Sequence, residues 1–99
     1  MVVRIWLDDV RPAPLGYVHC KSVNTAKKIV ESCEANKFPI EVIDCDHDLG
    51  DYFPDGGDGI RLLDWLEERK TYYPIKIHTM NPVGRQNMQV VVDRLKQFQ

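Results

Sequence analysis

Short apolar runs rich in β-branched residues alternate along this chain with segments whose apolar residues recur at helical spacing. The runs that predict strands are VVRIWL, YVHC, IEVIDC and IKIHTM, at residues 2–7, 17–20, 40–45 and 75–80. The segments that predict helices are residues 22–36, 59–73 and 81–98. Strands that alternate with helices form parallel sheets through right-handed crossovers. We therefore expect an α/β domain of three layers, with about four mainly parallel strands flanked by three helices.

The chain has 99 residues, which suits one domain covering residues 1–99. Its net charge of -2 provides no overall basic field that would attract nucleic acid or a membrane surface. Cys20, Cys33 and Cys45 are odd in number and lack the spacing of a zinc site, so we expect core residues in a reducing compartment. With no signal peptide and no long apolar run, the expected location is the cytoplasm, without a membrane partner.

Polar side chains stand where three of the predicted strands end. The carboxyl ends of parallel strands meet at one edge of a sheet, and ligands bind outside that edge. The side chains expected there are Asp8, Asp9, Asp46, His47, Asp48, His78, Thr79 and Asn81. The last helix begins at the same edge, so its backbone N–H groups, with Arg85 on its first turn, predict an anion site.

Two kinds of chemistry use such a set of side chains. The carboxylates of Asp8, Asp9, Asp46 and Asp48 are suited to Mg²⁺ or another divalent cation that bridges to a phosphate. His47 and His78, if their strands are neighbours, would flank one small group and act as an acid–base pair at phosphorus.

Several of these residues also have a purely structural interpretation. Arg11 is expected either to bind phosphate or to pair with Asp9, and Thr79 either to bind phosphate or to bond a neighbouring strand. Asn81 fits a helix N-cap, with or without a contact to the ligand. Asp44 lies deeper on the same strand face as Asp46, and we interpret it as a structural residue bonded to the backbone or to a lysine.

The stretches LDD, IDCDHDLG and GIRLL resemble the receiver domain of two-component response regulators. The resemblance implies a truncated, flavodoxin-like topology. It matches Asp46 to the phosphoacceptor, Asp8 and Asp9 to the Mg²⁺-binding acids, and Thr79 to the switch residue. The sequence departs from receivers because it has no room for a helix before residue 17 and no strand after its last helix to supply the receiver lysine.

A more specific resemblance is to the cyclic-phosphate-processing receiver-like family. It is carried by LDDVRPAP at residues 7–14, DHDLG at 46–50 and HTMNPVGRQNM at 78–88. It implies a phosphoesterase-like enzyme that acts on cyclic phosphates, such as 2′,3′-cyclic ends of RNA or a phosphate-containing small molecule. In that reading His47, His78 and Asp46 are catalytic, and Arg85, Asn81, Thr79 and Arg11 bind phosphate.

Two other functions are compatible with the sequence. The chain could be an atypical receiver that binds a cation and a partner without turnover, or a metal- or nucleotide-binding protein. The departures from the receiver pattern weigh against the first of these. An exposed sheet edge would permit self-association without fixing an oligomeric state.

Overall fold

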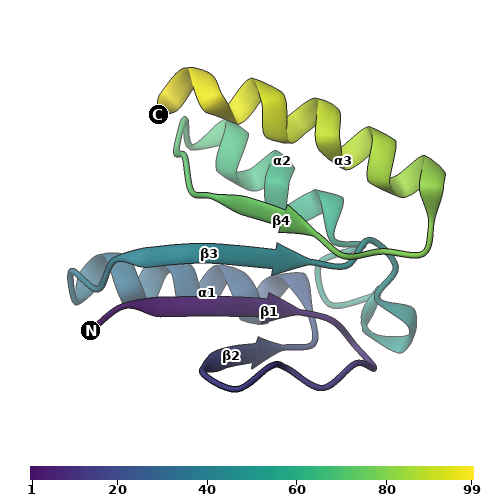
Figure 1. The fold of residues 1–99 in the computed structure, drawn as a ribbon, viewed down its shortest axis with the longest axis horizontal. Helices are drawn as coiled ribbons and strands as arrows, with labels where there is room; N and C mark the ends of the chain where they lie inside the picture. The colour runs from purple at the N-terminus through teal and green to yellow at the C-terminus, as the bar shows by residue number, and fades with distance from the viewer.

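The computed structural model describes residues 1–99 and contains one parallel sheet with three α-helices (Figure 1). The strands are β1 (Val3–Leu7), β2 (Tyr17–Cys20), β3 (Ile40–Cys45) and β4 (Ile75–Ile77). The helices are α1 (Val23–Ala35), α2 (Ile60–Glu68) and α3 (Pro82–Leu95), with short 3₁₀ turns at Gly50–Tyr52 and Lys96–Phe98. The strand order is β2-β1-β3-β4, and every pairing is parallel. The predicted α/β class and the parallel sheet are confirmed, and the strand at residues 17–20 lies at one edge of the sheet.

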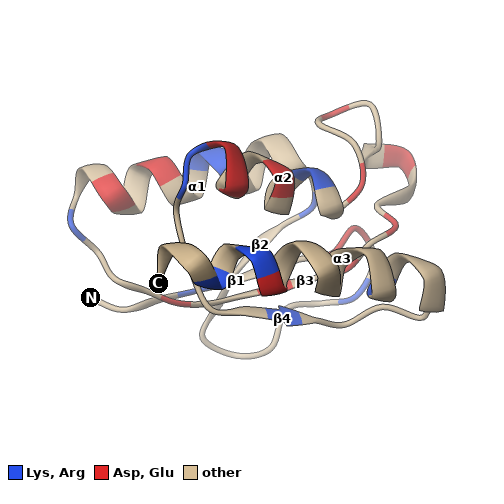
Figure 2. Cartoon of the chain, turned by 90° about the horizontal axis from the view of Figure 1, so that it is seen from above, with Lys and Arg blue, Asp and Glu red and all other residues tan.

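All three helices contribute to one hydrophobic core on a single face of the sheet. The strand residues in that core include Ile5, Leu7, Ile43 and Cys45, each fully buried. Figures 1 and 2 show α1 and α2 on one side of the sheet and α3 along the β4 edge. The third layer of the prediction is therefore absent. The physical reason is the direct link from β1 to β2, which has no helix to cover the opposite face.

That opposite face, which we call the open face, carries the alternate residues of the strands. They include Arg4, Trp6, Val42, Asp44 and Lys76. Because side chains alternate between the two faces of a strand, residues two positions apart share a face. The open face is consequently a mixture of aromatic, charged and aliphatic side chains instead of a second apolar core.

The predicted helix at residues 59–73 is too long, because α2 ends at Glu68. Lys70 adopts a left-handed conformation with φ of 54°, and the N–H groups of Lys70 and Thr71 donate to Glu67 and Leu66. This is a Schellman end with lysine in place of the usual glycine, so the sequence lacks the ordinary stop signal. The strand predicted at residues 75–80 is likewise shorter and ends at Ile77.

Two other sequence-based expectations concern the cysteines and the membrane. Cys20, Cys33 and Cys45 are free and buried, as predicted. Burial raises the pKa of the Cys20 thiol to about 11, so it stays protonated at neutral pH. No helix combines the length and apolar character needed to cross a bilayer.

Candidate functional site

The strand ladder sets the three polar strand ends side by side. The Asp46 N–H donates to the Leu7 carbonyl at 2.9 Å, and the His78 N–H donates to the Cys45 carbonyl at 2.9 Å. The Asp8 N–H donates to the Cys20 carbonyl at 3.0 Å. Each residue that follows a strand thus continues the parallel pairing by one step. The backbone therefore holds Asp8, Asp46 and His78 next to one another at the edge where the sequence predicted a site.

Strand phase decides which way each of these side chains points. Trp6 pairs with Asp44 in the β1–β3 register, and both lie on the open face. Asp8 and Asp46 are two residues further along their chains and share that side, where His78 joins them. His47 lies one residue after Asp46 and packs against α3 instead. The predicted histidine pair is thus divided between two groups of side chains.

His78 is held between two carboxylates and an aromatic ring. Its Nδ1 lies 2.6 Å from Asp44 Oδ1, and its Nε2 lies 2.9 Å from Asp8 Oδ2. Its ring stacks on Trp6 with the centroids 3.8 Å apart and the planes 6° from parallel. A carboxylate only accepts hydrogen bonds, so both contacts are satisfied when both ring nitrogens carry a hydrogen. We call Asp8, Asp44, Asp46 and His78 the open-face cluster.

Asp8 is the most deeply buried charged group in the chain, with 1% of its surface exposed. Its Oδ1 accepts the N–H groups of Val10 and Arg11, each at 2.8 Å, while Oδ2 faces His78. Burial by itself raises the pKa of Asp8. The two backbone donors and His78 outweigh this effect and hold its pKa below the ordinary 3.8. Asp8 is therefore an ionised carboxylate whose position is fixed on both oxygens.

His47 belongs to a second group of side chains, which we call the helix-side cluster and which comprises His47, Asp48 and Asp58. Its Nδ1 lies 2.9 Å from Asp48 Oδ1, and no hydrogen bond occupies its Nε2. A Cβ on Gly84 would lie 2.5 Å from His47 Cγ, so the ring rests directly on the α3 backbone. Glycine at this position is what allows the ring to approach the helix.

The turn from β3 into α2 also depends on a close backbone contact. The Gly59 N–H donates to the His47 carbonyl at 2.7 Å, and a Cβ on Gly59 would lie 1.8 Å from the Asp46 carbonyl oxygen. Only glycine permits this approach. The contact fixes the backbone of the Asp46–His47 pair, from which the two clusters diverge.

The residues predicted to bind phosphate occupy the rim of the site. Arg11 and Arg85 are exposed, and Arg11 forms no ion pair with Asp9. Arg85 Nη2 donates to the Thr79 carbonyl at 3.3 Å. Thr79 Oγ1 accepts the Asn81 N–H at 3.2 Å, so its hydroxyl already has a local partner.

The N-terminus of α3 has fewer free donors than the sequence implied. Asn81 is the N-cap, as predicted, and its Oδ1 accepts the Gly84 N–H at 2.9 Å. Pro82 has no N–H, and the Arg85 N–H donates to the Asn81 carbonyl. Val83 is left as the first-turn residue whose N–H is without a partner. An anion at this end would therefore depend mainly on the arginine side chains.

Two groups of side chains have the composition and spacing to hold a cation. Asp8, Asp46 and His78 each offer a ligand atom within 4.8 Å of the others, as do His47, Asp48 and Asp58. The four acids predicted as a single metal set are thus distributed. Asp8 and Asp46 are together, Asp48 is in the other group, and Asp9 lies against Gly50 in neither.

The open-face set fits a divalent cation. Its carboxylate oxygens and imidazole nitrogen are donors that such ions accept, although Mg²⁺ itself prefers oxygen alone. The cluster also contains three carboxylates and one imidazole, so positive charge would relieve their mutual repulsion.

Three residues have a larger place in the site than the sequence indicated. The lysine or backbone partner expected for Asp44 is wrong, because Asp44 bonds His78. Trp6, which stacks on His78, and Asp58, which lies with His47 and Asp48, were not among the predicted site residues. The spacing of Asp44, two residues before Asp46, already placed both on one face of their strand, whereas the pairing with the strand that carries His78 is seen only in the structure.

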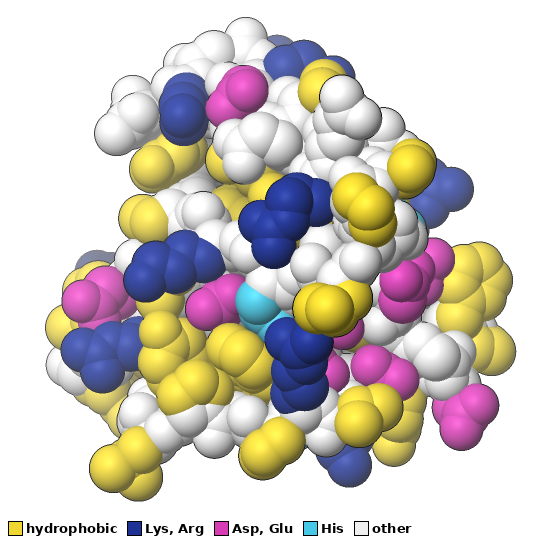
Figure 3. Space-filling model, turned by 45° about the vertical axis from the view of Figure 1, so that its right-hand side comes forward, with side chains coloured by type: hydrophobic (Ala, Val, Ile, Leu, Met, Phe, Trp, Pro, Cys, Tyr) yellow, Lys and Arg dark blue, Asp and Glu magenta, His cyan; other side chains and the backbone are white.

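Several acidic residues lie in the loops beyond the strand ends, and others lie on the helices (Figure 2). On the surface at this end, histidine lies next to acidic and basic side chains, with hydrophobic ones around them (Figure 3). The site therefore combines both signs of charge within a small area.

A parallel sheet in the order β2-β1-β3-β4, with acids and a histidine at the strand ends, defines a receiver-like α/β domain. The chain belongs to the cyclic-phosphate processing receiver domain family, whose model matches residues 3–94. This confirms the resemblance drawn from the three motifs. No curated protein and no solved structure matches the chain.

Proposed function

We propose that this chain is an enzyme that hydrolyses a cyclic phosphate diester to a phosphate monoester. The observation that carries the proposal is the arrangement of His78, fixed between Asp8 and Asp44 and adjacent to Asp46. The family to which the chain belongs is described as processing cyclic phosphates, which supports the same reaction class.

The reaction needs a base for the attacking water and an acid for the leaving oxygen. Water adds to phosphorus as one ring P–O bond breaks, so one proton leaves the water and one is delivered to the released alkoxide. His47 is suited to the base role. Its Nδ1 donates to Asp48, which leaves the lone pair of Nε2 to accept the proton from water.

His78 is suited to the acid role. A carboxylate only accepts hydrogen bonds, so the Nε2 that faces Asp8 is a nitrogen from which a hydrogen can be donated. The contact with Asp8 is longer than the contact with Asp44, so the leaving oxygen would take the place of Asp8 at Nε2. Asp44 would keep the ring oriented, and stacking on Trp6 would restrict its rotation.

A phosphate must also be attracted to a site rich in carboxylates. We propose that Arg11 and Arg85 contact its oxygens from the rim, with Asn81 and Thr79 lining the approach. A divalent cation such as Mg²⁺, held by the carboxylates of Asp8 and Asp46, would supply the positive charge that polarises the phosphoryl group.

The substrate class we propose is a phosphate-containing small molecule or an RNA end that carries a cyclic phosphate. Three free cysteines fit a reducing compartment, so the proposed location of this substrate is the cytoplasm.

The direct test is incubation of the purified chain with 2′,3′-cyclic nucleotides, with and without divalent cations, followed by ³¹P NMR of the product. Monophosphate should appear with the wild-type chain and be lost in His78→Ala. Asp93→Asn, an exposed carboxylate change on α3, serves as the matched control and should retain turnover. A folded wild-type chain that leaves every cyclic phosphate intact with each cation would rule out the proposal.

A receiver-type function has one observation in its favour. Asp46 lies with Asp8 in the open-face cluster, and its Oδ1 accepts the His47 N–H while Oδ2 is free to react. Acetyl phosphate with Mg²⁺ would then leave a phosphoryl mass increment on the chain, and Asp46→Asn would remove it. That result without hydrolysis of cyclic phosphates would establish a signalling module.

A further inference from the structure

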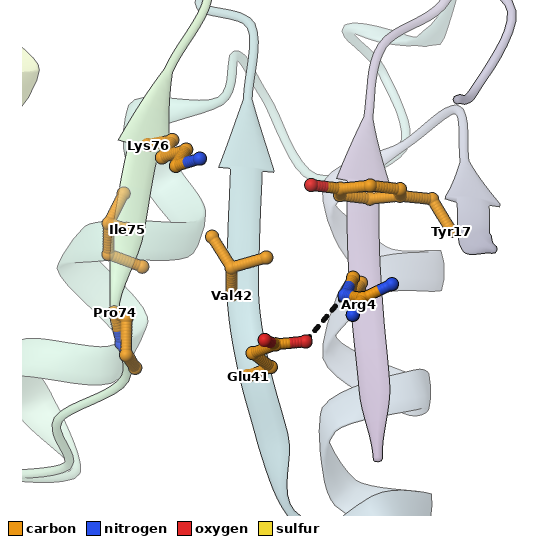
Figure 4. A pocket seen from close by; sticks show the side chains of 7 residues that line it. All are labelled: Arg4, Tyr17, Glu41, Val42, Pro74, Ile75 and Lys76. Carbon is orange, nitrogen blue, oxygen red and sulfur yellow. Dashed lines mark hydrogen bonds and ion pairs between the residues drawn. The ribbon is translucent and has the colours of Figure 1, made fainter. Parts of the chain in front are cut away.

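The open face also has a pocket, which lies closer to the amino ends of the strands than the open-face cluster does (Figure 4). Its volume is about 440 Å³, within the range of roughly 300–1,000 Å³ that is typical of small-ligand sites. Its lining comes from all four strands and includes Arg4, Tyr17, Val42 and Lys76. No step of the proposed reaction uses these residues.

The side chains around the pocket have distinct positions. Val42 forms part of the floor, and Tyr17 and Lys76 reach towards it from opposite sides (Figure 4). The Tyr17 ring is seen nearly edge-on, so one of its faces borders the space above Arg4 and Val42. An ion pair between Arg4 and Glu41 lies at the end of the pocket that is far from the carboxyl ends of the strands.

The pocket is continuous with the open-face cluster through two routes. Tyr17 packs edge-to-face on Trp6, with centroids 6.1 Å apart and planes at 81°, and Trp6 stacks on His78. Along β3, Val42, Asp44 and Asp46 are successive residues on this face, separated by roughly 6.6 Å at about 3.3 Å per residue. A ligand spanning two of these steps would touch both the pocket and the catalytic end.

We propose that this pocket binds the base of a nucleoside whose cyclic phosphate lies at the strand ends. The inference rests on the proposed hydrolysis and names its substrate class, a nucleoside 2′,3′-cyclic phosphate, either free or at the 3′ end of RNA. In such a molecule the ribose joins the base directly to the phosphate. It would pass over Asp44, with the base against Tyr17 and the phosphate near Asp46 and His78.

The chemistry of the lining matches that ligand. An aromatic face next to an aliphatic floor is what a base stacks on, irrespective of its sequence identity. Lys76 is exposed and forms none of the ion pairs in the structure. With Arg4 it outweighs Glu41, so the pocket has a net positive charge that attracts the anionic substrate as a whole to this face, while the uncharged base itself is held by stacking.

The first test compares two substrates that share the reacting group and differ in the base. Adenosine 2′,3′-cyclic phosphate should have a KM at least about tenfold lower than glycerol cyclic phosphate, the scale of one base–aromatic stack. Tyr17→Ala should remove this advantage with little change for the glycerol compound, and Tyr17→Phe should restore it. Equal KM values for both substrates, or equal losses for both in Tyr17→Ala, would overturn the pocket assignment.

The second test uses Lys76→Gln, a substitution at an exposed position that should leave folding intact. It should raise the KM of the nucleoside substrate several-fold, whereas Lys96→Gln, an exposed change at the end of α3, should not. A trinucleotide ending in the same cyclic phosphate distinguishes the two sources. If the trinucleotide has a lower KM than the mononucleotide, the substrate is an RNA end. If the two KM values are equal, the substrate is the free nucleotide, and both results support the pocket.

A binding measurement separates this inference from the proposed reaction. Adenosine 2′,3′-cyclic phosphate, titrated into ¹⁵N-labelled protein, should shift the amide resonances of Tyr17, Val42 and Lys76, and Tyr17→Ala should weaken the binding. Those shifts without turnover would leave the pocket standing and contradict the hydrolysis. Turnover without shifts at these residues would contradict the pocket alone, and the absence of both would contradict both.

Discussion

His78 and His47 follow neighbouring strands at the same edge of the sheet, yet their surroundings differ in almost every respect. His78 lies on the open face, with carboxylates at both nitrogens and an indole against its ring. His47 lies against α3 with one carboxylate partner, Asp48, whose side chain is 61% exposed. A one-residue change of strand phase, rather than residue type, therefore places the two histidines in different chemical surroundings.

The largest expected effect is the loss of either histidine, and the pH profile distinguishes their roles. His47→Ala and His78→Ala should each lower kcat/KM by about 10²–10⁴-fold, the usual contribution of a general base or acid. The wild-type profile should be bell-shaped. Rates for His47→Ala should no longer fall at low pH, since the base is gone, and rates for His78→Ala should no longer fall at high pH. Loss of the same limb in both variants would contradict the assignment.

The next effect concerns the buried carboxylate that anchors the open-face cluster. Asp8→Asn should destabilise the fold by roughly 1.5–3 kcal/mol at neutral pH, because it replaces hydrogen bonds to a charged group. The pKa of Asp8 is lowered on folding, so its contribution is present above the ordinary value of 3.8 and disappears as pH falls through the lower folded value.

Urea unfolding of the wild type and Asp8→Asn at pH 7 and pH 3 measures this contribution. The difference between the two proteins should be larger at pH 7 than at pH 3. Asp93→Asn, an exposed change, should show no comparable dependence. A difference that grows on acidification would mean that Asp8 is protonated in the folded protein.

A smaller effect comes from the carboxylates that orient the two rings. Asp44 is 14% exposed and lies 2.6 Å from His78, so Asp44→Asn should lower kcat roughly 10–100-fold, equivalent to about 1.5–3 kcal/mol. Asp48 is exposed, and exposed pairs contribute about 0–1 kcal/mol, so Asp48→Asn should lower kcat by about fivefold at most. Steady-state kinetics on both variants measures the ratio, and equal losses would remove the contrast between the clusters.

Much of the fold was predictable because it depends on local patterns. Alternation of β-branched runs and helical stripes predicted the order of the elements along the chain and the parallel sheet, and Asn81 followed from N-cap chemistry. Lys70 is a position where local patterns do not predict the structure. A left-handed lysine ends α2 through tertiary context, and no residue-type signal marks it.

The location of the site could be predicted from the sequence, but the contacts within it could not. The strand ends identified Asp8, Asp46 and His78, because the topology alone brings such ends together. The partner of Asp44 and the separation of His47 from His78 depend on the register and on which face lacks a helix. Those are properties of the assembled sheet, so a pattern read along one strand does not contain them.

The smallest expected effect tests whether the helix-side cluster can be altered alone. Gly84→Ala gains roughly 0.5–1 kcal/mol of helix preference but places a methyl group 2.5 Å from His47 Cγ, so a net destabilisation of about 1 kcal/mol is expected. The ring resonances of His47 should shift while those of His78 stay in place. The kcat should fall, but less than in His47→Ala. Gln86→Ala, on the exposed side of the same helix, is the control. If the resonances of His78 moved as well, the two clusters would be coupled through the Asp46–His47 backbone. The clusters would then be separate in space but could not be altered independently.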